Sequence, residues 1–358
     1  MTASRMPFPE SVEQLTSRRL RFNLEPTFRC NLSCSMCPRF SSTDPQLDMP
    51  METFSRIAAN FAFAHTVDFT GWGEPLLNTH LFRMMATASS AACTVTCTSN
   101  GTALTEENSH RLIDAGVNVL TISIDGITAT VYEQIRAGAD FQRVTANLRT
   151  LTRLLRSQAN AGTRRSMIVC VAFTIQESNW EQLSDLVDWV DSVGAQLIHL
   201  KHLNVVSTAA DLQNSLLKYR LPEPGCESYR SRPQRLERAE GLIGLLQEKA
   251  AQRGIAVFVH SEYPLTDELR PRHCLAAPLD AVYFSYDGMV SPCCHFGHTV
   301  SRFFQGRYEP PRALFYGDIK CQDFLEIWNS PQFQAFRRGF VTEDYSQACR
   351  SCYLLYGK

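Results

Sequence analysis

Residues 28–39 read Phe-Arg-Cys-Asn-Leu-Ser-Cys-Ser-Met-Cys-Pro-Arg, which places Cys30, Cys34 and Cys37 in the spacing Cys-x3-Cys-x2-Cys. The segment directly follows a short apolar run that favours a β-strand. Three thiolates on one tight loop can each bind one iron of a cubane 4Fe-4S cluster, and no fourth cysteine of the Cys-x2-Cys type lies nearby. One iron is then open to a chelating small molecule. A zinc loop, which usually has four ligands in paired halves, is the less favoured alternative.

Composition narrows the class of protein. The chain has 358 residues, of which 44% are hydrophobic and 20% are charged, with a net charge of -1. These values are typical of a globular enzyme and argue against nucleic acid as a partner. The sequence has neither a run of about 18 apolar residues nor the apolar core of a signal peptide, so we expect a cytoplasmic protein. In a reducing compartment, 13 cysteines favour metal binding or redox chemistry over disulfides.

Short apolar strands alternate with helical stretches between about residues 20 and 204, which predicts repeated β/α units and a parallel sheet. Six such units make an incomplete (β/α)6 barrel, whose chemistry is expected at the C-terminal ends of the strands. We place helix caps at Thr105 and Ser178. The predicted strands are 21–25, 66–69, 94–98, 119–124, 167–175 and 196–202, and the predicted helices include 51–63, 106–115, 180–193 and 235–253.

The chain divides into four segments by composition. Residues 1–20 form an N-terminal extension, and residues 21–232 form the barrel core, which ends in a polar, proline-bearing insertion from residue 203. Residues 233–266 supply a linking helix and a strand. Residues 267–358 form a tail that holds six of the 13 cysteines, so we expect a smaller α+β domain there.

In its context, the segment 28–39 resembles the signature loop of the radical SAM superfamily. The resemblance implies a partial TIM-like barrel of the radical SAM type, a 4Fe-4S cluster that binds S-adenosylmethionine (SAM), and an external one-electron reductant such as flavodoxin or ferredoxin. It also implies reductive cleavage of SAM to a 5'-deoxyadenosyl radical, chemistry that the cofactor supplies while the protein orients it. Met36, before the last cysteine of the loop, occupies the position that packs on the adenine.

Further segments match the same family. The turn Thr70-Gly71-Trp72-Gly73-Glu74-Pro75 follows the second predicted strand, where the family receives the methionyl amine of SAM. Missing side chains at Gly71 and Gly73 let backbone carbonyls approach an ammonium group closely. The planar fork of an arginine suits a carboxylate. The resemblance implies that the SAM-binding residues are Met36, Gly71, Gly73, Glu74, Asn100, Ser123, Arg136 and, on the adenine side, Ile175.

The tail carries a second set of cysteines, namely Cys274, Cys293 within the pattern Gly-x4-Cys, and the pair Cys349 and Cys352. It resembles the SPASM and Twitch domains that follow some radical SAM cores. Because the chain ends six residues after Cys352, the resemblance implies the shorter Twitch form with one auxiliary 4Fe-4S cluster. Four thiolates also suit zinc, which remains the alternative.

Several remaining residues are candidates for chemistry on a substrate. Cys294 follows a predicted ligand and Cys226 lies in the insertion, and either is a candidate hydrogen donor to a substrate radical. His295 and His298 are candidates for acid–base steps. Lys201 ends the sixth predicted strand, where a lysine either anchors a polar substrate or forms a salt bridge.

The expected function is abstraction of hydrogen from a C–H bond of a small polar natural-product intermediate, leading to oxidation or epimerisation. A maturase of a ribosomally made peptide is the first alternative. A non-catalytic iron–sulfur electron carrier or sensor is an alternative from another class.

Overall fold

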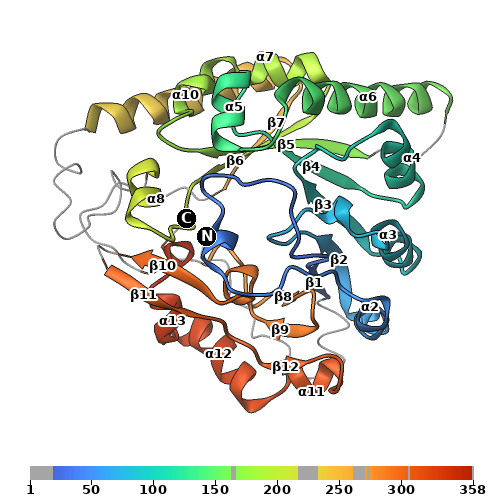
Figure 1. The fold of residues 1–358 in the computed structure, drawn as a ribbon, viewed down its shortest axis with the longest axis vertical. Coiled ribbons are helices and arrows are strands. Elements are labelled where there is room, and N and C mark those ends of the chain that lie inside the picture. Colours follow the sequence, from blue (N-terminus) through green and yellow to red (C-terminus); the bar gives the residue numbers. More distant parts are fainter. Residues whose placement is uncertain are drawn as a thin grey trace.

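The computed structural model describes residues 19–162, 167–216, 233–260, 271, 274–304 and 307–356. Its centre is a curved sheet in which β1 to β7 follow one another in parallel (Figure 1). This confirms the partial barrel. The strand assigned above to the linking segment is β7, and it extends the barrel by pairing with β6. The strands are β1 Leu20–Leu24, β2 Ala64–Phe69, β3 Thr94–Ser99, β4 Val119–Ser123, β5 Ile168–Ile175, β6 Leu197–His202 and β7 Ala256–His260.

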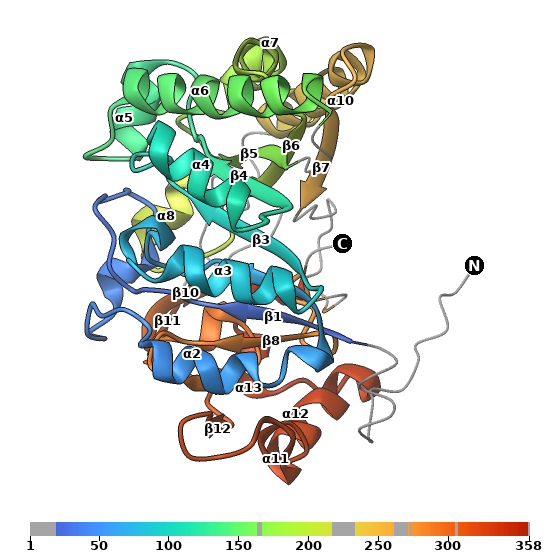
Figure 2. The same cartoon turned by 90° about the vertical axis from the view of Figure 1, so that its right-hand side faces the viewer.

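Helices cover the outer side of this sheet (Figures 1 and 2). Helices such as α4 present an apolar stripe to the strands, here Leu112 and Ile113. Thr105 caps α4 as expected, whereas Asn179 rather than Ser178 precedes the 3-10 turn Trp180–Gln182 that leads into α7. The helices are α2 Met51–Ala58, α3 Leu81–Ser90, α4 Glu106–Asp114, α5 Ala129–Ile135, α6 Phe141–Asn160, α7 Leu183–Val193, α8 Ala209–Asn214 and α10 Pro233–Gln252.

The two sides of the sheet differ in polarity because successive strand side chains point to opposite faces. On β2, Val67 and Phe69 are fully buried in the apolar core. Asp68 lies between them and accepts hydrogen bonds from the hydroxyls of Thr70 at 2.7 Å and Thr96 at 2.9 Å. The side of the sheet opposite the core is therefore lined with polar groups.

The tail continues the same sheet instead of forming a separate layer. Strand β8 (Ala281–Phe284) pairs in parallel with β1, and β9 (Met289–Ser291) and β12 (Gly317–Asp318) follow in antiparallel order. Phe284 packs on Phe22 with ring centroids 5.2 Å apart, which joins the cores of the two parts. The remaining elements are β10 Val300–Phe304, β11 Arg307–Arg312, α11 Phe324–Trp328, α12 Pro331–Thr342 and α13 Gln347–Arg350.

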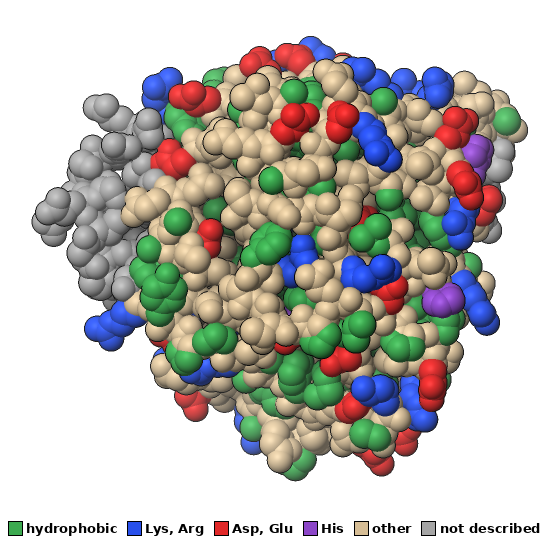
Figure 3. Space-filling view, viewed as in Figure 1, with side chains coloured by type: hydrophobic (Ala, Val, Ile, Leu, Met, Phe, Trp, Pro, Cys, Tyr) green, Lys and Arg blue, Asp and Glu red, His purple; other side chains and the backbone are tan. Residues whose placement is uncertain are grey.

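On the face drawn in Figure 3, basic and acidic side chains are interspersed. None of the helices in the described part of the chain combines the length and the apolar character that a membrane crossing needs.

Candidate active site

A cavity of about 250 Å³ opens at the C-terminal ends of the barrel strands. The segment 28–39, here called the signature loop, contributes Cys30, Cys34 and Cys37 to its lining. All the residues predicted to bind SAM line it except one, and these are Met36, Gly71, Gly73, Glu74, Asn100, Ser123 and Arg136. The tertiary structure thus brings together segments of the first four β/α units.

Each thiol of the signature loop faces a hydrogen-bond donor. The side-chain amide of Asn100 lies 3.9 Å from the sulfur of Cys30, and Nη1 of Arg136 lies 3.9 Å from the sulfur of Cys34. Burial raises the pKa of Cys34 to about 11 and also raises the pKa of Cys37, which the backbone and side chain of Arg39 partly offset. Donors to sulfur stabilise a thiolate and tune a bound cluster.

The turn 70–75, here called the glycine turn, packs against the start of the signature loop. A Cβ at Gly73 would lie 2.2 Å from the carbonyl oxygen of Thr27 and 2.6 Å from that of Arg29. A Cβ at Gly71 would lie 2.3 Å from Cγ of Glu25. Both glycines are therefore needed for close approach of two chain segments.

Glu74 and Asn100 hold these segments in place. The buried carboxylate of Glu74 accepts hydrogen bonds from the backbone N–H groups of Leu76 and Asn100 and from the hydroxyl of Ser99. Burial raises the pKa of Glu74, and those donors lower it in part. The Asn100 amide donates to Oδ1 of Asn31 at 3.0 Å. Glu74 therefore connects the glycine turn to the loop after β3, and Asn100 connects that loop to the signature loop.

Arg136 reaches the cavity from the end of α5. Its Nη2 lies 2.6 Å from Oδ2 of the fully buried Asp125. Burial lowers the pKa of Arg136, but the charges of Asp125 and Cys34 outweigh that and raise it overall. Arg136 is therefore a fixed cation beside the signature loop. Ile175 does not line the cavity, and its neighbour Thr174 does.

The second set of thiols gathers in the tail and is more deeply enclosed. Desolvation raises the pKa of Cys293 and Cys274 well above the ordinary value, and each thiol also acts on the others. Burial raises the pKa of Cys349 to about 12 and also raises that of Cys352. The buried Arg302 carries the positive charge that acts on three of these four thiols. The structure thus brings together the four predicted auxiliary cysteines.

Two family models match the chain in these two parts. The model of the radical SAM superfamily matches residues 24–189, and that of an iron–sulfur cluster-binding domain, the SPASM domain, matches residues 274–353. The chain belongs to the radical SAM superfamily. It is a radical SAM enzyme with a C-terminal SPASM domain, which implies a SAM-binding 4Fe-4S cluster and auxiliary iron–sulfur binding.

Relatives extend the match over most of the chain. A tungsten-containing aldehyde ferredoxin oxidoreductase cofactor-modifying protein of Pyrococcus furiosus is 24% identical, covering 92% of this chain and 86% of its own. An AdoMet-dependent heme synthase of Oleidesulfovibrio alaskensis is 21% identical, covering 97% and 83%. Among solved structures, Streptococcus suis SuiB bound to the precursor peptide SuiA has a TM-score of 0.64 at 15% identity, covering 95% of this chain and 71% of SuiB. This chain therefore shares its fold with SuiB.

The four thiols of the SPASM domain are suitable ligands for the auxiliary cluster that the family model implies, and their chemistry alone also suits zinc. Zinc needs all of its sulfur ligands about 2.3 Å from one point. Ligands of a 4Fe-4S cluster are spread over separate irons and need not converge so tightly.

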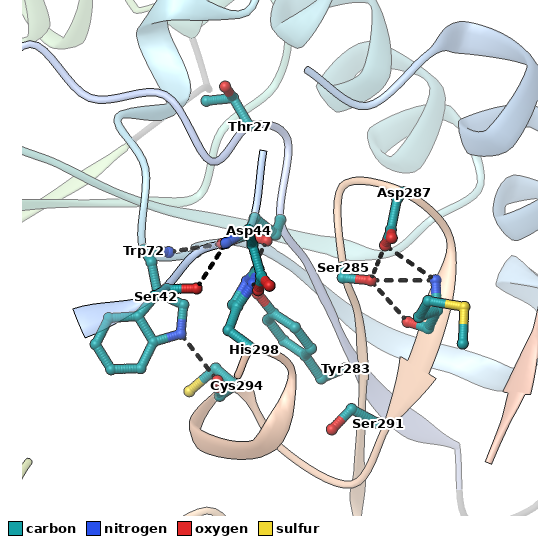
Figure 4. A network of polar contacts seen from close by, with 12 residues as sticks. Thr27, Ser42, Asp44, Trp72, Tyr283, Ser285, Asp287, Ser291, Cys294 and His298 are labelled. Carbon is teal, nitrogen blue, oxygen red and sulfur yellow. Dashed lines mark hydrogen bonds and ion pairs between the residues drawn. The ribbon is translucent and has the colours of Figure 1, made fainter. Parts of the chain in front are cut away.

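A buried histidine joins the SPASM domain to the radical SAM core (Figure 4). Nε2 of His298 lies 2.7 Å from Oε2 of Glu25, at the end of β1, and Nδ1 lies 2.8 Å from Oδ2 of Asp44. Oε1 of Glu25 accepts a hydrogen bond from the backbone N–H of Trp72, and the Trp72 indole donates to the carbonyl of Cys294. Burial lowers the pKa of His298, but the two carboxylates outweigh it and raise the pKa overall. We call Glu25, His298 and Asp44 the histidine clamp.

Of the two cysteines predicted to donate hydrogen, only Cys294 lies within the described residues. Cys294 begins a 3-10 turn beside Trp72, and its sulfur is close enough to Lys201 for the two to act on each other electrostatically. Burial raises the pKa of Cys294 to about 12, which keeps it a protonated thiol. Cys294 is not among the residues that line the cavity. Cys226 lies outside the described residues.

Sequence reasoning missed two parts of the site. Glu25 and Asp44 were not singled out, because nothing local distinguishes a clamp carboxylate from a solvated one. Trp72 was read only as part of the glycine turn. A glutamate directly after a buried apolar strand, within five residues of the signature cysteines, was the available signal for Glu25.

Proposed function

We propose that this enzyme cleaves SAM reductively and abstracts a hydrogen atom from a C–H bond of a small polar molecule, leading to its oxidation or epimerisation. One observation carries the proposal. The cavity combines the three thiols of the signature loop with the hydroxyls of Thr70, Thr98, Ser123 and Thr174 and the ammonium of Lys201. Such polar groups orient a polar substrate beside the bound cofactor.

The donor sets fit the groups that the family implies. When bound, the signature-loop cluster and SAM supply a 5'-deoxyadenosyl radical, which abstracts hydrogen from unactivated C–H bonds. In this proposal Cys30, Cys34 and Cys37 hold the first cluster, and Cys274, Cys293, Cys349 and Cys352 hold the auxiliary one.

The protein's own residues bind SAM and shield the reacting groups. Arg136, fixed by Asp125, offers its guanidinium to the SAM carboxylate. Carbonyl groups of the glycine turn, which lines the cavity, would receive the methionyl ammonium. Trp72 lines the cavity and its indole donates a hydrogen bond to the carbonyl of Cys294, so it connects the cavity wall to the SPASM domain. An external one-electron reductant such as flavodoxin or ferredoxin completes the proposed system.

The size of the substrate is the finer part of the proposal. The cavity must hold SAM and the reacting part of the substrate together. Two of the relatives that match nearly the whole chain are named as a cofactor-modifying protein and a heme synthase, which supports a small molecule. The fold is also that of SuiB, which binds a precursor peptide, so peptide modification is the second candidate.

Anaerobic reconstitution tests the radical SAM activity. We expect about eight irons per chain and formation of 5'-deoxyadenosine when dithionite and SAM are added. About four irons, with zinc in the tail, would contradict the auxiliary cluster. No 5'-deoxyadenosine would contradict the enzyme and favour the iron–sulfur carrier or sensor.

Isotope labelling separates the two outcomes for the substrate. A product oxidised by two electrons, with one 5'-deoxyadenosine per turnover, would support oxidation. Uptake of deuterium from solvent at an inverted carbon, lost in Cys294→Ala, would support epimerisation, because the protonated thiol then supplies the returning hydrogen. Incubating the enzyme separately with small-molecule and peptide fractions of a cell extract tests the size of the substrate.

A further inference from the structure

Lys201 is a cation on the inner wall of the barrel. It lies near the end of β6, between its strand partners Thr174 on β5 and His260 on β7. Lys201 and Thr174 both line the cavity that holds the thiols of the signature loop. A lysine so placed points its charge at whatever occupies the cavity beside SAM.

The charged side chains that line the cavity differ in whether another protein group already binds them. Among the described residues, three Asp, Glu, Lys or Arg side chains line it, namely Glu74, Arg136 and Lys201. Both oxygens of Glu74 accept hydrogen bonds from the protein, and Arg136 is paired with Asp125 at 2.6 Å. In the part of the chain that the structure describes, no carboxylate lies within ion-pair distance of Lys201.

The nearby carboxylate that acts on Lys201 is already engaged. Asp125 raises the pKa of Lys201, but burial outweighs it and lowers that pKa overall. Oδ2 of Asp125 is held by Arg136, and Oδ1 accepts the backbone N–H of Thr174 at 2.7 Å. Lys201 is half-buried and lines the cavity, where a bound anion would supply the ion-pair partner that its ammonium lacks.

We propose that Lys201 binds an anionic group of the substrate, a carboxylate or a phosphate. The assignment rests on the proposed function, and it narrows the substrate class to anionic molecules. Lys201 and Arg136 come from different parts of the barrel. Arg136 lies beside Cys34 of the signature loop, and its charge also acts on Lys201, so the two cations face the same cavity. Because Asp125 already balances the charge of Arg136, Lys201 is the cation left to bind a second anion, that of the substrate, beside the SAM carboxylate.

Chemical labelling of the full-length reconstituted enzyme tests this assignment without a variant. The enzyme is saturated with SAM, treated with methyl acetimidate, and digested, and the amidination rate of each lysine is read by mass spectrometry. Acetate and inorganic phosphate are the two probes, with chloride at equal ionic strength as the reference. Lys320, whose side chain is 46% exposed on the SPASM domain, is the internal control.

We expect acetate, phosphate or both to slow labelling of Lys201 by about twofold at a concentration near the probe's Kd, with Lys320 unchanged. The probe that protects identifies the carboxylate or the phosphate. Equal rates in all three salts would overturn the assignment. So would equal slowing at both lysines, or complete protection by SAM alone, which would assign Lys201 to the SAM carboxylate.

Calorimetric titration of the same probes into Lys201→Met and Lys320→Met provides a second measurement. The heat of anion binding should be lost only in Lys201→Met. Formation of 5'-deoxyadenosine by the wild-type preparation separates the two hypotheses. If it forms while Lys201 is unprotected, the anion site is wrong and the proposed function stands. If Lys201 is protected and no 5'-deoxyadenosine forms, the proposed function is wrong.

Discussion

The signature-loop thiols come from one local segment and line a cavity, whereas the auxiliary thiols come from three segments and none of them lines that cavity. Both sets lie beside a buried arginine. Arg136 has a carboxylate partner in Asp125, and its pKa is raised overall. Burial lowers the pKa of Arg302, which stacks on Phe296 and is influenced by the charges of Cys352, Cys293 and Cys349.

This difference indicates different tasks. A site with three thiols, a charge-balanced arginine and an open cavity can admit a cofactor and a substrate. A site with four thiols, three of which are acted on by the charge of Arg302, can supply every ligand of a cluster without a further one. The open set therefore fits chemistry on SAM, and the closed set fits electron transfer or structural support.

Cys34→Ala should have the largest effect. Loss of one of three ligands removes the first cluster, so 5'-deoxyadenosine should fall to assay background and iron from about eight to about four per chain. The exposed Cys321, outside both thiol sets, is the matched control, and Cys321→Ala should keep all the iron. Iron and sulfide analysis with EPR checks this. Retained SAM cleavage in Cys34→Ala would remove the distinction between the two sets.

Gly73→Ala should lower SAM cleavage by about 10- to 100-fold. The new Cβ would meet the carbonyls of Thr27 and Arg29, which are backbone atoms and cannot swing away, so the start of the signature loop must shift. Gly241→Ala on α10, where a Cβ meets nothing within 4 Å, is the control and should be neutral or stabilising. Initial rates of 5'-deoxyadenosine formation measure the effect. Equal rates in the two variants would show that the close approach is dispensable.

Cys293→Ala should damage the closed site selectively. We expect iron to fall to about four per chain while the EPR signal of the SAM-bound cluster persists. Product formed per 5'-deoxyadenosine should fall by about tenfold or more, because the auxiliary cluster supports steps on the substrate. Loss of both clusters together would mean that the two sites fold as one unit.

His298→Gln should loosen the joint between the two regions in a pH-dependent way. The raised pKa of His298 means that its stabilising contribution is full below its unfolded pKa of about 6.5 and is lost as pH rises through the folded value. The variant should lose about 2–4 kcal/mol at pH 6 and less at pH 9. Denaturant unfolding of the apo-protein at both pH values measures this, with the exposed His110→Gln as control. A loss independent of pH would indicate a packing role without charge.

Arg302→Met should have the smallest effect. Removing the positive charge beside three thiolates stabilises the oxidised auxiliary cluster, so its midpoint potential should become more negative by about 60 mV, a tenfold change for one electron. The potential of the SAM-binding cluster should stay unchanged. Redox titration followed by EPR distinguishes the two clusters. An equal shift in both would mean that Arg302 acts on the whole protein.

Local patterns were sufficient to predict the first six strands, whereas the glycine turn and the two sets of cysteines were indicated by the resemblance to the family. A cluster-binding loop needs thiols that lie close together in the sequence. In a strand, apolar residues at every second position indicate which face is buried. Boundaries shifted by one or two residues, as for β5, predicted from residue 167 and observed as Ile168–Ile175.

Long-range pairing was not visible in the sequence. The addition of β7 beside β6 and of β8 beside β1 depends on hydrogen bonds between segments far apart in the chain. The histidine clamp joins Glu25 and Asp44 to His298 across more than 250 residues. The sequence predicted that Lys201 lies near the end of a strand. Whether Lys201 forms an ion pair depends on the positions of Asp125 and Arg136 in the folded protein. The sequence by itself determines which charged side chains follow the strands. Only the tertiary structure decides that Arg136 pairs with Asp125 and that Lys201 faces the cavity, because both depend on contacts between distant segments.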